Sequence, residues 1–122
     1  MDYRLINADN GTKIISIEDD SILIEDEQSV LDIFMPIVYE TGEARFIISK
    51  HNLPENFFNL SNKTAGNILQ KVTTYRMKLA IVGDFSGYSS KALKAFIYES
   101  NNGNDIFFVG DRASAISVLS KK

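Results

Sequence analysis

Short apolar runs alternate with amphipathic segments along most of this chain, and that alternation constrains its fold more than any other feature. Three β-prone runs stand at 44–50, 78–85 and 105–110. Between and after them, apolar residues recur at the three- and four-residue spacing of a helix that buries one face. Strands that alternate with helices predict a mostly parallel or mixed sheet with helices packed on it.

Two further β-prone runs, Tyr3 to Asn7 and Lys13 to Ile17, precede this alternation. The dipeptide Asn10-Gly11 lies between them and supplies the positive φ angles that a tight hairpin turn needs. We therefore predict an N-terminal hairpin, with a loop of two residues or more. The element order is then β-β-α-β-α-β-α-β-α, an α/β fold with about five strands in a single domain spanning residues 1–122.

The first predicted helix begins near Gln28 and ends at Gly42, which suits the position just past a helix. Pro36 lies inside it and predicts a kink, because proline removes an interior hydrogen bond. The preceding apolar island, 22–24, either extends the sheet or packs as a loop. The predicted inward faces of the four helices are Val30, Leu31, Phe34, Met35 and Val38; Ala65, Ile68, Leu69 and Val72; Leu93, Phe96 and Ile97; and Ala115, Ile116 and Leu119.

Polar residues at the predicted helix starts suggest side-chain caps. Ser61 or Asn62 is expected to cap the second helix, Ser89 or Ser90 the third, and Asp111 the last. Gly66 lies inside the second helix, where it lowers helix propensity, and this suggests close packing or backbone approach at that position.

Composition excludes several classes of function. The 122-residue chain has a net charge of −3 and no basic stripe, so we expect no nucleic-acid partner. It has no cysteine, which excludes disulfides, thiol catalysis and thiolate-bound metals. No stretch approaches the length of a membrane span and the N-terminus lacks an apolar signal region, so a cytoplasmic location without membrane contact is expected.

The stretch VGDFSGYSS, at 82–90, is the main site candidate. It follows an apolar strand and precedes a helix, which is where ligands gather in open α/β sheets. Its backbone amides and hydroxyls suit an anion, although the carboxylate repels one and the motif is neither a P-loop nor a nucleophile elbow. A plain turn is the other interpretation. The candidate residues here are Asp84, Ser86, Gly87, Tyr88, Ser89 and Ser90.

His51 is the only histidine, and it follows the strand at 44–50. It should therefore lie on the same sheet edge as Asp84. A set in which Asp84 orients His51 and His51 activates Ser86 would make a small hydrolase or transferase. The other interpretation of His51 is a half-exposed loop residue. With one histidine and no cysteine, neither a metal nor another cofactor is expected.

Two adjacent aromatic residues, Phe57 and Phe58, lie in the long connection 51–75. At most one of two neighbours is expected to point straight into the core. The other could cover the strand ends as part of a lid at 53–60, or form an interface. A separate hypothesis is an apolar-ligand cavity beneath the two rings. Burial of both rings would count against the lid.

Three segments carry a family resemblance: YETGEARFIISK (39–50), residues 57–93 with KLAIVGDFSGY, and residues 96–116 with FIYESN. They resemble an uncharacterised bacterial family catalogued as domain of unknown function 4180. The resemblance covers nearly the whole chain and implies no activity.

The element order is also similar to the SpoIIAA-like or STAS-like fold, which houses anti-sigma-factor antagonists and regulatory modules of anion transporters. Those antagonists carry a phosphorylatable serine in an Asp-Ser-Ser-Gly motif, and the corresponding stretch here, SKHNLPEN at 49–56, lacks it. The antagonist switch therefore does not carry over.

The first functional hypothesis is a non-enzymatic STAS-like regulatory or binding module. It would recognise an unidentified protein partner or small ligand through 51–56 and 84–90. The second is the hydrolase or transferase described above. A homodimer formed through an exposed sheet edge or helix face is also expected to be possible.

Overall fold

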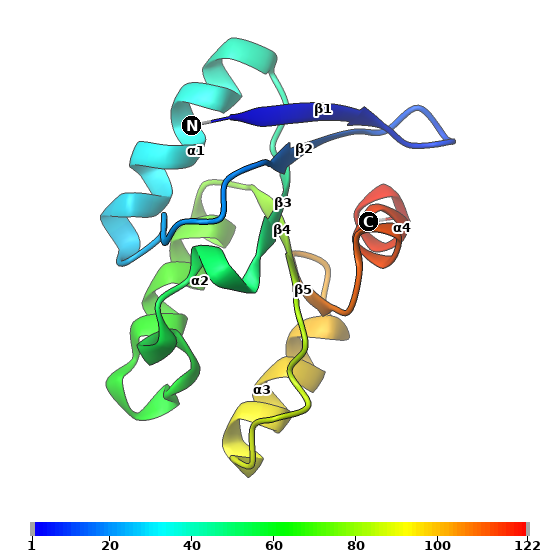
Figure 1. Ribbon diagram of the computed structural model, residues 1–122. Helices are drawn as coiled ribbons and strands as arrows, with labels where there is room; N and C mark the ends of the chain where they lie inside the picture. Colours follow the sequence, from blue (N-terminus) through cyan, green and yellow to red (C-terminus); the bar gives the residue numbers. More distant parts are fainter. Residues whose placement is uncertain (1, 122) are drawn as a thin grey trace.

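The computed structural model describes residues 2–121, except for the side chain of Asn62, and shows one five-stranded sheet flanked by α-helices (Figure 1). The predicted α/β class and the element order are confirmed, with three short 3-10 turns added before α2. The strands are β1 (Tyr3–Asn7), β2 (Lys13–Ile17), β3 (Arg45–Ser49), β4 (Lys78–Val82) and β5 (Ile106–Val109). The helices and turns are α1 (Glu27–Thr41), η1 (Lys50–Asn52), η2 (Glu55–Phe58), η3 (Leu60–Asn62), α2 (Thr64–Thr74), α3 (Lys91–Asn101) and α4 (Arg112–Lys121).

The strands lie side by side in chain order. β1 pairs antiparallel with β2, and β2 to β5 are parallel to one another. Helices α1, α2 and α3 contribute to the large core on one face of the sheet, and α4 contributes to the smaller core on the other. The carboxyl ends of β2 to β5 therefore lie along one edge of the sheet, which we call the carboxyl edge.

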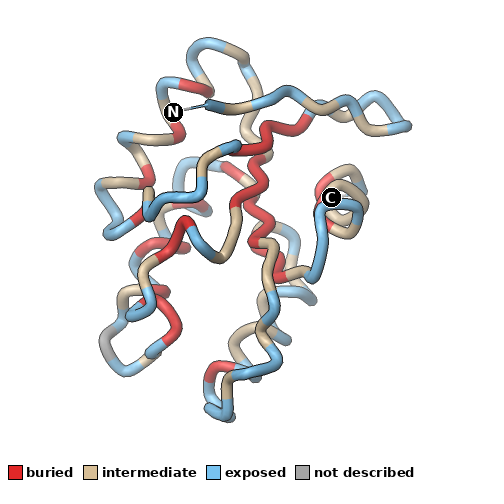
Figure 2. Tube along the Cα trace, in the orientation of Figure 1, coloured by how far each residue is buried: buried red, intermediate tan, exposed pale blue. Residues whose placement is uncertain are grey.

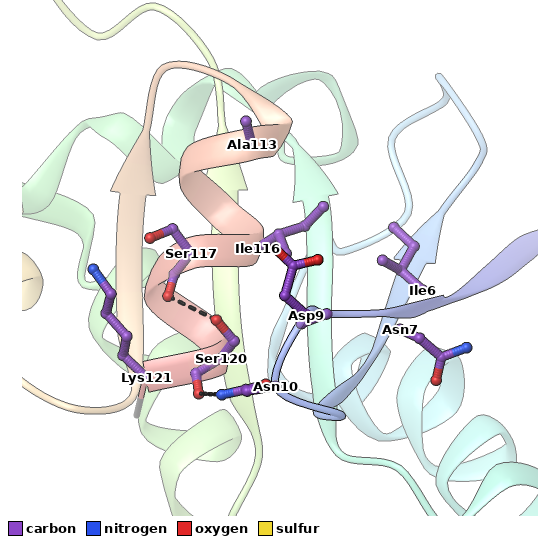
Figure 3. A pocket seen from close by; sticks show the side chains of 10 residues that line it. Ile6, Asn7, Asp9, Asn10, Ala113, Ile116, Ser117, Ser120 and Lys121 are labelled. Atoms are coloured by element: carbon purple, nitrogen blue, oxygen red, sulfur yellow. Dashed lines mark hydrogen bonds between the residues drawn. The ribbon is translucent and has the colours of Figure 1, made fainter.

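The second face of the sheet is covered by α4 alone among the described helices. Its buried Ala115 and Leu119 pack on a row of strand residues. The C-terminal end of α4 is tied to the hairpin loop, where Asn10 Nδ2 donates to the Ser120 carbonyl at 2.9 Å (Figure 3). The strand residues in this core are Ile14, Ile47, Ala80 and Phe107.

Ser16 is a buried polar residue on the second face of the sheet, whose other buried strand residues are apolar. It is only 1% exposed, and its hydroxyl has no hydrogen-bond partner among the residues that the structure describes. The neighbouring Ile15 and Ile17 point to the opposite face and are buried in the large core. A buried hydroxyl without a partner carries a desolvation cost that no hydrogen bond offsets.

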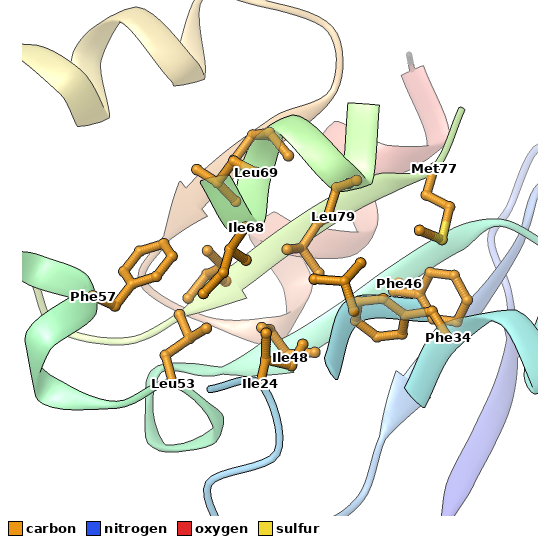
Figure 4. Close-up of a cluster of buried hydrophobic side chains, with 14 of the residues drawn as sticks. Ile24, Phe34, Phe46, Ile48, Leu53, Phe57, Ile68, Leu69, Met77 and Leu79 are labelled. Carbon is orange, nitrogen blue, oxygen red and sulfur yellow. The ribbon is translucent and has the colours of Figure 1, made fainter. Parts of the chain in front are cut away.

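The large core fills the space between the sheet and α1 to α3. Figure 2 shows the buried residues concentrated in the central strands and on the inner sides of these helices. Phe34 of α1 stacks on Phe46 of β3, with ring centroids 4.4 Å apart and both rings almost fully buried (Figure 4). Ile68 and Leu69 of α2 belong to the same core, together with buried residues of β3 and β4.

The first helix is close to the prediction. Asp26 caps α1 by accepting from the Ser29 amide, and Gly42 follows it in the left-handed conformation with φ of 75°. Val30 and Phe34 are buried as predicted, whereas the third buried residue is Ile37 rather than Leu31. The helix runs through Pro36 without a break.

The start of α2 differs from the prediction. Its N-cap is Lys63 in the left-handed conformation, with no side-chain cap hydrogen bond, so Ser61 is not the cap. The other expected cap, the side chain of Asn62, lies outside the described residues. Gly66 is exposed and a Cβ there would meet nothing within 4 Å, so the expected close packing was wrong. The predicted inward face of α2 is confirmed as Ala65, Ile68, Leu69 and Val72.

Candidate functional site

The carboxyl edge brings the two halves of the predicted site to the same side of the sheet. Ser49 of β3 pairs with Val82 of β4, so His51 and Asp84 both follow neighbouring strand ends, as predicted. After β4 the chain turns to the face with α3, and after β5 it turns to the face with α4. In such sheets the usual ligand crevice lies where the loops of neighbouring strands leave toward opposite faces, here between β4 and β5. The loops after β3 and β4, which carry His51 and Asp84, instead lead to α2 and α3 on the same face.

Asp84 and Ser86 form a closed local turn. The Asp84 carboxylate accepts from the Ser86 amide at 2.9 Å and from the Ser86 hydroxyl at 2.6 Å. These hydrogen bonds, that of the Ser86 side chain first, hold the pKa of Asp84 below its usual value. The carboxylate is therefore ionised near neutral pH, and the hydroxyl of Ser86 is directed at it.

His51 is exposed at the start of the β3–α2 connection. Its backbone amide donates to the Ser49 hydroxyl at 3.1 Å. Its imidazole forms no hydrogen bond with Ser86 or Asp84 among residues 2–121. This edge therefore contains an acid–serine pair that is not connected to the histidine. A relay of the serine protease type requires the histidine to bond to both the serine and the acid.

A cavity of about 430 Å³ opens beside His51. It lies between the chain that follows β2 and the chain that follows β3, and no residue of 84–90 lines it. The lining residues are Asp20, Ile22, Lys50, His51, Leu53 and Glu55. It is an open groove of mixed charge rather than an enclosed pocket shared by His51 and Ser86.

Lys50 occupies the space between the two halves of the site. Its ammonium nitrogen lies 4.5 Å from the ring centroid of Tyr88, 5.6 Å from that of Phe58 and 5.8 Å from that of Phe85. We call Phe58, Phe85 and Tyr88 the aromatic cluster. The ammonium also donates to the Asp84 carbonyl at 3.2 Å. Attraction between a cation and ring faces within about 6 Å holds this lysine in place.

The aromatic cluster joins three segments of the chain. Phe58 stacks on Tyr88 at 5.1 Å, and Phe85 meets Phe108 of β5 edge-to-face at 5.3 Å. The Tyr88 hydroxyl donates a long hydrogen bond of 3.4 Å to Glu55. The loop that carries VGDFSGYSS is therefore packed against η2 and β5.

Gly83 makes room for the stem of Lys50. A Cβ built on Gly83 would lie 2.7 Å from Lys50 Cβ, closer than two such carbons approach in proteins. The small residue after β4 is thus required by the path of the lysine. Sequence reasoning placed Gly83 within the motif but could not detect this contact, because the two residues are far apart in the chain.

The remaining motif residues have structural roles or none. Ser90 caps α3 by accepting from the Leu93 amide at 3.1 Å, as one of the two predictions for this helix had it. Gly87 is exposed and does not have a positive φ, so the turn does not depend on a glycine there. Ser89 is exposed in the loop. Asp111 accepts from the Ser114 amide at the start of α4, as predicted.

The lid predicted for 53–60 is not supported. Phe57 and Phe58 are both buried, at 0% and 6% exposure, and belong to the large core. Their rings meet edge-to-face at 5.0 Å. Adjacent residues both point inward because η2 is a 3-10 turn rather than a strand, so the alternation assumed in the prediction does not apply.

Asn52 is an important residue that sequence reasoning missed. It is fully buried, and its Nδ2 donates to the carbonyls of Asp19 at 2.6 Å and Ser21 at 2.9 Å. Its Oδ1 accepts from the Ser49 amide at 2.8 Å. Its own carbonyl accepts from the amides of Leu23 and Ile24. The apolar island at 22–24 therefore packs as a loop held by Asn52, and does not extend the sheet.

Two other cavities lie away from the carboxyl edge. One of about 480 Å³ separates the hairpin from α4 (Figure 3). The other, of about 420 Å³, lies between α2 and α3 and includes Gly66 and Phe96. None of the three cavities is lined by Phe57 or Phe58, so the predicted apolar cavity beneath these rings is not found among them.

Residues 2–121 contain no candidate metal site and no candidate membrane-spanning helix. No group of three His, Cys, Asp or Glu side chains in this range is placed to hold a metal ion. No described helix is both long and apolar enough to cross a membrane.

Comparison with known proteins identifies a family. Residues 9–119 match the family described as Domain of unknown function (DUF4180). The match spans most of the chain, so the protein belongs to this family. No curated protein and no solved structure matches it.

Proposed function

We propose that the protein is a non-enzymatic module with a STAS-like fold, which binds a partner protein through its carboxyl edge. The element order is the one that this resemblance implies. The binding surface would consist of the turn Asp84–Ser86, the exposed loop residue Ser89 and the groove beside His51.

The observation that carries this proposal is the arrangement around Lys50. Three aromatic rings and a backbone carbonyl hold its ammonium between the two halves of the edge. Such contacts give a surface of fixed shape, and fixed shape reduces the ordering cost of binding. The open groove offers a broad contact area, which suits a protein better than a small ligand.

The hydrolase alternative has no comparable support. The hydroxyl of Ser86 donates to Asp84, which leaves no base in contact with it except an ionised carboxylate with a lowered pKa. A base of low pKa removes a serine proton poorly at neutral pH.

The test is site-specific photo-crosslinking in cells of the source organism. A photoreactive residue at Ser89 should yield an adduct of defined mass with one protein. The same residue at Tyr98, which is 71% exposed on α3, is the control and should not yield it. Exchange of Lys50 for methionine should reduce the Ser89 adduct, because it removes the charge that the rings hold. The same adduct at both positions, or none at Ser89, would refute the proposal.

A parallel assay addresses the alternative. Hydrolysis of a panel of activated esters and phosphoesters should be no faster with the protein than with its Ser86→Ala variant. A rate that depends on both Ser86 and His51 would replace the binding proposal with an enzymatic one.

A further inference from the structure

The two edge strands of the sheet, β5 and β1, differ in whether their outward-facing backbone groups are hydrogen-bonded. On the outer side of β5, the Asn101 side chain from α3 accepts from the Phe108 amide at 2.7 Å and donates to the Phe108 carbonyl at 3.1 Å. This side-chain amide occupies the outward-facing backbone groups of Phe108, which another strand would use. Exposed edges are commonly protected against pairing in this kind of way. β1, at the opposite edge, has no such cover among the described residues (Figure 1).

The pairing of β1 with β2 defines which of its groups face outward. The Glu18 amide donates to the Asp2 carbonyl, and the Ala8 amide donates to the Thr12 carbonyl. The backbone amides and carbonyls of the even-numbered residues of β1 therefore point toward β2. In an antiparallel pair the hydrogen-bonding direction alternates along the strand. The backbone amides and carbonyls of Tyr3, Leu5 and Asn7 therefore point away from the sheet, and no hydrogen bond to them is found within residues 2–121.

We propose that β1 is a dimerisation edge, on which a second copy of this chain pairs through its own β1. The strands would run antiparallel about a twofold axis at Leu5. Leu5 then faces Leu5 of the second copy, and Tyr3 faces Asn7. Each facing pair exchanges two backbone hydrogen bonds, so all outward groups of β1 are paired. The result is one continuous sheet through both copies, with the edge protected by Asn101 at each outer end.

Charge and strand length together favour this register over its two neighbours. With the axis at Leu5, Arg4 lies opposite the uncharged Ile6, and Asp2 lies opposite Ala8. Shifting the axis to Arg4 would place two arginines directly opposite each other, which is destabilising. Shifting it to Ile6 would move Tyr3 opposite Asp9, which lies beyond the end of β1 and outside the paired region.

The side chains also suit a twofold contact. Leu5 is an apolar residue left 44% exposed at the centre of the edge. Arg4 shares the Glu18 carboxylate with Arg112, at 3.2 Å and 3.0 Å, and the axis at Leu5 avoids placing it directly opposite its copy. A self-complementary strand with its apolar residue on the axis favours a second copy over an unrelated peptide. The interface is small, so the dimer is expected to be weak and concentration-dependent.

Sedimentation velocity of the full chain provides the first test. From about 10 µM to about 1 mM, a range that covers weak interfaces, the 13.7 kDa chain should shift reversibly toward twice its mass. Leu5→Lys places two like charges on the axis and should weaken dimerisation roughly tenfold or more. Leu5→Thr, which retains strand propensity, is the matched control and should still dimerise. Circular dichroism of each variant checks that the fold is retained.

A cysteine on the axis gives a second, independent readout. The chain has no cysteine, so Leu5→Cys introduces a single thiol. Facing hydrogen-bonded residues have Cα atoms about 5.5 Å apart, within the range that a disulfide spans. Mild oxidation should therefore convert Leu5→Cys to a covalent dimer much faster than Tyr98→Cys, whose thiol would lie on α3.

Three results would overturn the proposal. The wild-type chain could remain monomeric over the whole concentration range, including the case in which it instead binds an extended peptide at β1. A dimer could survive Leu5→Lys unchanged, which would place the contact elsewhere. Tyr98→Cys could also oxidise to a dimer as fast as Leu5→Cys, which would show that collision rather than pairing controls the reaction.

Discussion

Replacing Asn52 with alanine should destabilise the whole domain, although the residue lies in a connection rather than in a strand or helix. The side chain makes three hydrogen bonds, to Ser49, Asp19 and Ser21, in a site with no solvent exposure. Each such bond contributes about 0.5–1.5 kcal/mol net, and a buried group left unpaired costs about 1–3 kcal/mol. Because the loosened loop can admit water to some of these groups, we expect a loss of about 2–4 kcal/mol.

Urea unfolding followed by circular dichroism measures this loss. With a slope of about 2 kcal/mol per M, the middle of the range for small domains, the midpoint should fall by about 1–2 M while the slope stays constant. The control is Asn102→Ala, which removes a single exposed hydrogen bond to the Tyr98 carbonyl and should change stability by less than about 0.5 kcal/mol. A loss below that value for Asn52→Ala would show that the buried amide does not hold the loop.

The isosteric change Asn52→Asp tests the polarity of the same contacts. A carboxylate there would face the Asp19 and Ser21 carbonyls, so burial and repulsion should raise its pKa in the folded state. The native state then binds more protons than the unfolded state, and stability must fall as pH rises. The difference in unfolding free energy between this variant and the wild type should accordingly grow from pH 4 to pH 7, and a constant difference would contradict the geometry.

Three further changes test the site and the sheet. Ser86→Ala should raise the pKa of Asp84 toward its ordinary value in an NMR titration, because the hydrogen bond from the Ser86 side chain is the largest cause of the lowered pKa. The lowered pKa stabilises the folded state above the ordinary pKa of the carboxyl, and this contribution is lost as pH falls through the lowered pKa. In the variant this pH-dependent part of the stability should be smaller. Gly83→Ala should cost about 1–3 kcal/mol through its clash with Lys50 Cβ, and the cost measured by urea unfolding should be smaller in a Lys50→Gly background. Ser16→Ala should raise the unfolding free energy by about 1 kcal/mol because it removes an unpaired buried hydroxyl, and a loss would indicate a hidden partner.

Much of the fold was predictable because its signals are local. The hairpin strands Tyr3–Asn7 and Lys13–Ile17 have the predicted bounds, and the element order is confirmed. Alternation, helical spacing and an Asn-Gly turn each depend on residues a few positions apart. The prediction was wrong where local rules have exceptions, as at the start of α2 with its left-handed Lys63 and in η2 with its two buried phenylalanines.

The site was predictable only as a location. Parallel strands end at a common edge, so the placement of both His51 and Asp84 at that edge followed from the strand order. Which group would bond to which did not follow, since Asp84 bonds to Ser86 while Lys50 enters the space between the two halves. Side-chain partners depend on rotamers and packing that no spacing rule contains.

The amino-acid sequence accordingly determined the class of fold, the strand order along the chain and the faces that each helix buries, because burial of apolar surface follows from periodicity. The folded chain decided the rest. It placed Asn52 beneath the 18–24 loop, enclosed Lys50 within the aromatic cluster, and protected the β5 edge with Asn101 while leaving β1 open. Most of these contacts join residues that are distant in sequence, so they can form and stabilise the fold only once the sheet has brought those segments together.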